Sequence, residues 1–104
     1  MYNLNSLSSH SKAIFLFGSI LRKGKEARDV DVCIILKKSE DYKLLQGIIR
    51  EINEKNRLKI DPLYLTEHEF EKKLIEKDKP LVEIIKSCLV VHGHELFVEV
   101  VKNV

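Results

Sequence analysis

Hydrophobic positions along the chain follow two spacings in turn, which predict strands and helices. Short apolar runs of the kind found in buried strands occur at 12–17, 29–36, 58–65 and 89–92. Apolar residues three or four positions apart, as on one face of a helix, occur at 39–55, at 66–76 and at 81–88. Residues 20–23 can form a further short helix, and the tail 94–101 fits both spacings, with a helix favoured.

Polar residues mark where these elements begin and end. Ser39 is placed to cap the first long helix, and Thr66 with Glu69 forms a capping-box pattern at the next. Pro62 removes a backbone donor, so the third strand is expected at a sheet edge or at a bulge. Gly93 closes the last strand. The first 11 residues, rich in Asn and Ser, are expected to form a loose lead-in or a short helical turn.

The order of elements is roughly βαβαβααβα, which predicts an α/β (α+β) domain with a small mixed sheet flanked by helices. With 104 residues, the chain is long enough for one core and too short for two. We therefore expect a single domain over 1–104.

Composition indicates the cellular compartment and argues against some partners, but it does not indicate the activity. The net charge of +2 gives no electrostatic reason to infer nucleic-acid binding. No apolar run reaches the ~18 residues needed to span a membrane, and the polar start lacks a signal-peptide core. Cys33 and Cys88 belong to no CxxC pair, so we expect buried free thiols and a cytoplasmic protein.

Three carboxylates are candidate ligands for divalent cations. Asp29 and Asp31 open the second strand two residues apart, so both side chains point to one face, with Cα atoms roughly 6–7 Å apart. Two carboxylates at that spacing can share a pair of divalent cations. Asp61 is an acid in the otherwise apolar third strand, where burial is costly unless a cation or a lysine compensates the charge.

The turn after the first strand is a candidate phosphate site. Gly18 and Ser19 follow an apolar run, where backbone N–H groups can meet a phosphate. A P-loop is excluded, because that motif has four residues between its glycines and then Lys with Ser or Thr. Here five residues separate Gly18 from Gly24, and Glu26 follows Lys25.

Together these residues carry a family resemblance. The Phe17-Gly18-Ser19 turn, the basic loop, the Asp29-Val30-Asp31-Val32 run and the later Asp61 resemble the minimal nucleotidyltransferases of the DNA polymerase beta superfamily. The resemblance covers roughly residues 12–97. It implies the polymerase beta-like fold and a magnesium-dependent transfer of a nucleoside monophosphate from a nucleoside triphosphate, expected to be ATP, to a hydroxyl acceptor.

The same resemblance implies a role for each matching residue. Asp29, Asp31 and Asp61 would be catalytic and would bind two Mg²⁺ ions, while Gly18 and Ser19 would contact the phosphates. Basic side chains of the loop could screen the triphosphate, although a solvated loop charge is the simpler interpretation for each: Arg22, Lys23, Lys25 and Arg28.

The loop departs from the family pattern at two points. The usual Gly-Ser-Ala-Arg-Gly is replaced by Gly-Ser-Ile-Leu-Arg-Lys-Gly, and Arg28 stands where a Ser commonly precedes the first aspartate. Ser19 and Asp29 are also about one residue closer than in many relatives. The three carboxylates stay in place, and the loop geometry and substrate choice are what these changes affect.

An alternative function is that of an interaction protein. Stand-alone domains of this family resemble the antitoxin half of a toxin–antitoxin pair whose partner is a small helical HEPN-type protein. This chain has only about 43 residues after Asp61 and lacks the helical extension with which larger relatives hold base and acceptor. The apolar tail around Phe97 is either an oligomer surface or, as we favour, packed on the sheet. Failure to co-purify with such a helical protein would count against the partner.

Overall fold

A four-stranded mixed sheet is the centre of the molecule. The computed structural model describes residues 4–18, 29–57 and 59–102. The strands lie side by side in the order β3-β2-β1-β4, and their bounds are Ser11–Phe17 for β1, Asp29–Leu36 for β2, Lys59–Thr66 for β3 and Leu89–His92 for β4. β1 is antiparallel to both of its neighbours, β2 and β4, whereas β2 and β3 run parallel.

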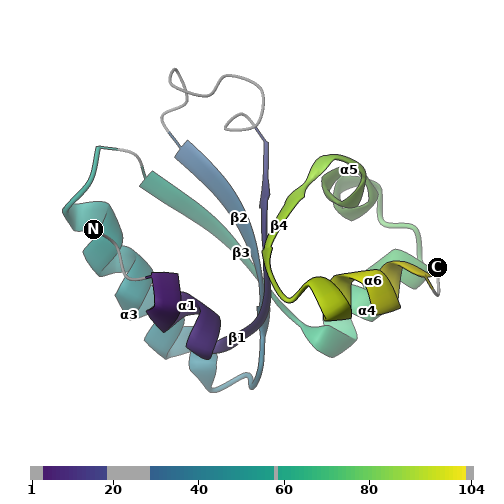
Figure 1. Cartoon of the computed structure of the whole chain (residues 1–104), viewed down its shortest axis with the longest axis horizontal. Coiled ribbons are helices and arrows are strands. Elements are labelled where there is room, and N and C mark those ends of the chain that lie inside the picture. Colours follow the sequence, from purple (N-terminus) through teal and green to yellow (C-terminus); the bar gives the residue numbers. More distant parts are fainter. Residues whose placement is uncertain (1–3, 19–28, 58, 103–104) are drawn as a thin grey trace.

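Helices cover both faces of this sheet. One face carries α1 (Leu4–Ser9) and α3 (Asp41–Glu54), and the opposite face carries α4 (Glu67–Ile75), α5 (Lys79–Ser87) and α6 (His94–Lys102) (Figure 1). α3 connects β2 to the parallel strand β3, as a crossover between parallel strands requires. The fold class expected from the sequence is confirmed, and the order of strands and helices is roughly the expected one.

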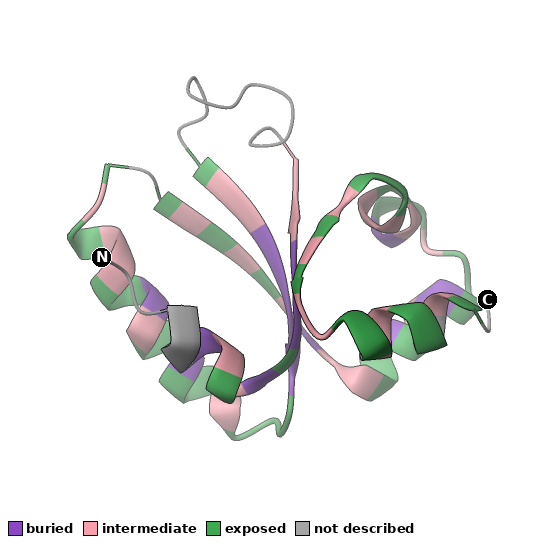
Figure 2. Ribbon diagram, viewed as in Figure 1, coloured by how far each residue is buried: buried purple, intermediate pink, exposed green. Residues whose placement is uncertain are grey.

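The core consists of two clusters, one on each face. Alternate residues of β2 enter different clusters, because successive side chains of a strand point to opposite faces. Cys33 and Ile35 pack with Phe70 of α4 and Leu81 of α5, whereas the other cluster joins β2 to α1 and α3 through Val32, Ile34, Leu36, Leu7, Leu45 and Ile49. Figure 2 shows that β2 is buried towards its C-terminal end and exposed where it begins.

Aromatic contacts anchor the α4–α6 face. Phe15 of β1 is completely buried, and its ring lies 5.6 Å from that of Phe70 and 5.2 Å from that of Phe97, measured between centroids. Phe97 is on α6, so the tail packs on the sheet as a helix, as favoured from the sequence. Cys33 is also completely buried, and burial raises the pKa of its thiol to about 12. Cys33 and Cys88 are both free thiols, as expected, but Cys88 is only half-buried.

The ends of the helices confirm one predicted cap and correct another. The Thr66 hydroxyl accepts from the Glu69 N–H at 3.1 Å, and Glu69 Oε1 accepts from the Thr66 N–H at 2.9 Å, which completes the capping box. These hydrogen bonds lower the pKa of Glu69, so its contribution to stability is present at neutral pH and is lost as the pH falls through that pKa. The Ser39 cap was wrong: α3 begins at Asp41, and its N-cap residue, Glu40, makes no side-chain bond.

Two further expectations concern the segments around β1. Of the alternatives for the first 11 residues, the helical one is observed, because Leu4–Ser9 is the helix α1. The Ser11 hydroxyl, which is completely buried, donates to the Leu7 carbonyl at 2.6 Å and ties this helix to β1. The short helix expected at 20–23 lies outside the described residues.

β3 is an edge strand, as Pro62 predicted, and its outer edge is closed by side chains. The Asn53 amide both donates to the Ile60 carbonyl at 3.0 Å and accepts from the Ile60 N–H at 2.7 Å. Lys59 donates to the Asn53 carbonyl and the Asn56 carbonyl at the end of α3. α3 therefore protects the strand that it leads into. No helix in the described part of the chain is long and apolar enough to cross a membrane.

The two helix starts provide a stability test. Thr66→Ala removes the hydroxyl that caps α4, and we expect it to lower the free energy of unfolding by about 1 kcal/mol. The matched control is Ser39→Ala, which removes an exposed hydroxyl that caps nothing and should stay within about 0.5 kcal/mol of the wild type. Urea unfolding of both variants measures the difference. Equal losses would contradict the assignment of the two caps.

Candidate functional site

The three predicted acids lie on neighbouring strands and point to the same face of the sheet. Asp29 and Asp31 are on β2, and Asp61 is on β3 directly opposite Asp31 in the parallel register. Asp31 shares its side of β2 with Cys33, and Asp61 shares its side of β3 with Leu65, both of which belong to the cluster facing α4 and α5. Pairing of the two strands thus places a carboxylate of one next to a carboxylate of the other.

The closeness of the acids affects the pKa of Asp31. Burial raises the pKa of the Asp31 carboxyl above its ordinary value, and the negative charges of Asp61 and then Asp29 raise it further. A hydrogen bond between the Asp31 and Asp61 side chains acts in the same direction, because it favours the protonated form of Asp31. Like charges at this place destabilise the ionised protein unless a cation compensates them.

Gly18 is the residue that makes room for the Asp31 carboxylate. Its φ is +80°, a left-handed conformation that residues with a side chain rarely adopt. A Cβ added at this position would lie only 2.1 Å from Asp31 Oδ2. The turn after β1 therefore needs glycine for two separate reasons, one of backbone conformation and one of space.

The donor set at this edge suits a hard divalent cation. Carboxylate oxygens are the ligands that Mg²⁺ prefers, usually one or two of them together with waters and phosphate oxygens. Asp31 and Asp61 are in contact and carry the like charge that a cation would neutralise. In the described part of the chain, no three His, Cys, Asp or Glu side chains are grouped closely enough to hold a metal ion. Asp31 and Asp61 are thus a pair of candidate ligands, and Asp29, on the same face of β2, does not lie close enough to form a group of three with them.

Asp61 is more exposed than the sequence suggested. The sequence suggested an acid in a buried strand, but Asp61 is exposed because β3 is the edge of the sheet. The alternative partner, a lysine at the sheet edge, is not observed among the described residues, whose ion pairs are made by other acids. Asp61 contacts Asp31 instead. The remaining predicted phosphate contacts, Ser19, Arg22, Lys23, Lys25 and Arg28, lie outside the described residues.

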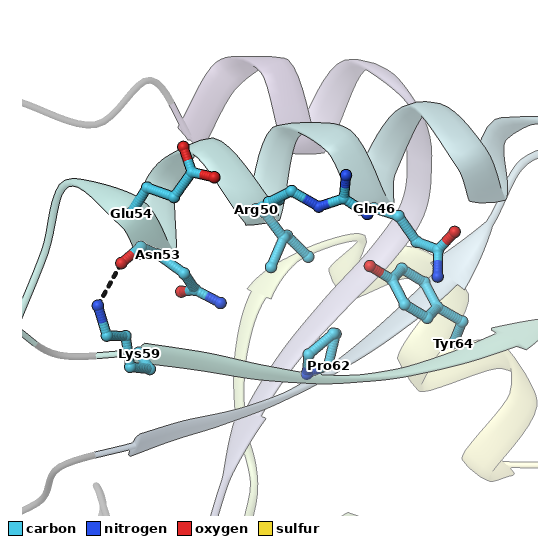
Figure 3. A pocket seen from close by; sticks show the side chains of 8 residues that line it. Gln46, Arg50, Asn53, Glu54, Lys59, Pro62 and Tyr64 are labelled. Atoms are coloured by element: carbon cyan, nitrogen blue, oxygen red, sulfur yellow. Dashed lines mark hydrogen bonds between the residues drawn. The ribbon is translucent and has the colours of Figure 1, made fainter.

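A separate groove of about 450 Å³ lies on the other side of β3. Figure 3 shows Gln46, Arg50 and Asn53 of α3 facing Pro62 and Tyr64 of β3 across it. The Tyr64 hydroxyl is buried without a hydrogen-bond partner in the described structure, and burial raises its pKa to about 12. Pro62 and Tyr64 alternate with Asp61, so this groove opens on the face opposite the acids. The sequence analysis did not predict this groove, although residues 60, 62 and 64 are two positions apart in a strand and therefore share one face.

Comparison with known proteins gives one family. The model of the family described as "Nucleotidyltransferase domain" matches residues 3–92, which span the whole sheet and all three acids. Neither the curated proteins nor the solved structures gave a significant match. The matched region ends at β4, so α6 lies beyond it.

Glycine substitutions test how closely the turn and the acid are coupled. Gly18→Ala introduces a strained φ, which costs about 1–2 kcal/mol, and a Cβ that must displace the Asp31 carboxylate. We expect lower stability and a smaller rise in melting temperature on adding Mg²⁺. The matched control is Gly47→Ala in α3, where a Cβ meets nothing within 4 Å and helix propensity predicts a gain of about 0.5–1 kcal/mol. An unchanged Mg²⁺ response in Gly18→Ala would refute the coupling.

Proposed function

The chain belongs to the nucleotidyltransferase domain family, and we propose that it transfers a nucleoside monophosphate from a nucleoside triphosphate to a hydroxyl acceptor with the help of Mg²⁺. Family membership supports nucleotidyl transfer in general. Metal dependence, the nucleotide, expected to be ATP, and the acceptor are the parts that we add.

The observation that carries the proposal is the Asp31–Asp61 pair. Each acid comes from a different strand, and the parallel register brings them opposite one another on one face. The pair lies at the exposed end of β2 and β3, away from the buried core. An acid whose pKa is raised by burial and by neighbouring acids, as that of Asp31 is, is typical of a functional site. A purely structural role would call for a cationic partner, and the described residues give Asp61 none.

Each part of the site has a defined task in this proposal. Asp31 and Asp61 would hold Mg²⁺, and Asp29, on the same face of β2, would complete the acidic set. The Gly18 turn lets its backbone approach the Asp31 carboxylate, so that a phosphate bound by the turn would lie beside the acids. A magnesium ion held by these carboxylates would lower the pKa of an acceptor hydroxyl and neutralise the leaving pyrophosphate.

Positioning is the contribution of the protein itself. β2 is packed on both faces beyond Asp31, where Cys33, Ile34 and Ile35 are completely buried. The carboxylates therefore project from a rigid strand, which limits the freedom that the reacting groups would otherwise lose in the transition state. Asp61 is on the edge strand and exposed, so an acceptor can reach it without opening the core.

Substitution of the two acids tests the proposal. Asp31→Asn and Asp61→Asn each replace a carboxylate ligand with a neutral amide of the same size. The loss of several kcal/mol of charge stabilisation predicts at least ~10²-fold slower transfer. The assay is transfer of label from an α-labelled nucleoside triphosphate in the presence of Mg²⁺. Both variants should be as stable as the wild type or more so at neutral pH without Mg²⁺, because each removes like-charge repulsion.

Asp41→Asn is the matched control for this experiment. Asp41 is an acid in the first turn of α3, on the face opposite the site, and its nearest ionic partner is His10 at 3.9 Å. Its substitution should leave transfer unchanged. Transfer by Asp31→Asn or Asp61→Asn at the wild-type rate would refute the proposed roles of these acids.

A further inference from the structure

The two edges of the sheet differ in how their backbone groups are blocked. The outer edge of β3 contains Pro62, which has no N–H, and Asn53 satisfies both backbone groups of Ile60. β4 pairs with β1 alone among the described strands, and its residues Leu89–His92 include neither a proline nor a lysine. Edge strands of stable proteins are normally blocked by such devices or kept very short, because unpaired backbone groups otherwise bind another strand. β4 has only four residues, but none of its side chains blocks the edge.

The side chains of β4 add an apolar surface to this open edge. Leu89 is 55% exposed and Val91 is 41% exposed. Both point to the same face, because they are two residues apart. The alternate residues are engaged inside the protomer: Val90 packs against the core cluster, and His92 Nε2 lies 3.1 Å from the Ser11 carbonyl oxygen. One face of β4 is thus packed within the protomer through Val90 and His92. The other face presents Leu89 and Val91, and no described strand pairs with the outer backbone edge.

We propose that β4 pairs with β4 of a second copy of this chain, antiparallel and centred on Val90. Two identical edge strands related by a two-fold axis perpendicular to the sheet pair in this way, and directly opposite residues then lie on the same face. With Val90 opposite Val90 of the partner, Leu89 falls opposite the partner's Val91. The two exposed apolar side chains cover each other twice, once on each side of the axis.

Charges at the two ends of β4 favour a second copy over an unrelated strand. α5 ends just before β4 with the basic residue Lys86 in its last turn, and α6 begins just after β4 with the acidic residue Glu95 in its first turn. Antiparallel pairing brings the beginning of one β4 beside the end of the other. Lys86 of each protomer then approaches the partner's Glu95, and neither side chain has an ion pair within the described part of its own chain.

The resulting assembly joins two four-stranded sheets into one continuous sheet. β1 lies between β4 and β2, so the acids on β2 and β3 are at the far edge of each half. The pairing therefore leaves Asp31 and Asp61 accessible in both copies. It is independent of nucleotidyl transfer, and either proposal can fail without the other.

Light scattering coupled to size-exclusion chromatography tests the pairing on the full chain. The wild type should elute with the mass of a dimer that dissociates on dilution. Val91→Lys and Leu89→Lys each place a charge in the apolar contact and should raise the dissociation constant by more than about tenfold, a cost of ~1.4 kcal/mol. Ile75→Lys is the matched control, since Ile75 on α4 is 70% exposed and away from β4, and it should stay dimeric. Circular dichroism verifies that every variant is folded.

Two further readouts keep the test independent of any single variant. Amide hydrogen exchange of Leu89–His92 should slow with rising protein concentration, because the outer N–H groups become paired. Lys86→Glu and Glu95→Lys should each weaken the dimer, and the double variant should restore it. A wild type that is monomeric at all concentrations would overturn the proposal. So would a dimer that Val91→Lys and Leu89→Lys leave intact.

Discussion

Parallel pairing of β2 with β3 is the interaction on which the rest of the structure depends. Two parallel strands need a crossover, and α3 provides it on one face of the sheet. That leaves the beginnings of both strands free on the opposite face. The register sets Asp31 directly opposite Asp61, and a slip by one residue would turn one of the two carboxylates to the α3 side. Fold and candidate site are therefore consequences of one register.

This arrangement stores like charge at the sheet edge, and the local structure tolerates it in two ways. Exposure of Asp61 keeps part of the charge in water, and the raised pKa of Asp31 reflects the part that is not. Gly18 adds the space that Asp31 needs, at the cost of a backbone conformation suited to glycine. The core beyond Asp31 supplies the rigidity. The acids proposed to bind the cation thus lower the stability of the fold, whereas the core that stabilises the fold lies away from them.

Local signals in the sequence predicted most elements and singled out the three acids as candidates. Spacing of apolar residues predicted the four strands and α3 to α5, and it left α6 open between helix and strand with a helix favoured. Thr66 with Glu69 predicted the start of α4. What local signals do not contain is pairing. The register of Asp31 with Asp61, the closure of β3 by Asn53 and the open edge of β4 depend on residues far apart in the chain. The Ser39 cap failed because a capping residue type does not determine where the helix begins.

The most direct test of the central claim is to locate a divalent cation. Mn²⁺ can replace Mg²⁺ at carboxylate sites, and its unpaired electrons broaden the NMR signals of nearby nuclei. Titration of the isotope-labelled protein with Mn²⁺ is predicted to broaden the amide signals of Gly18, Asp31 and Asp61 first, and those of β4 and the N-terminal turn of α3 last. Early broadening around Asp41, or none at Asp31 and Asp61, would contradict the account.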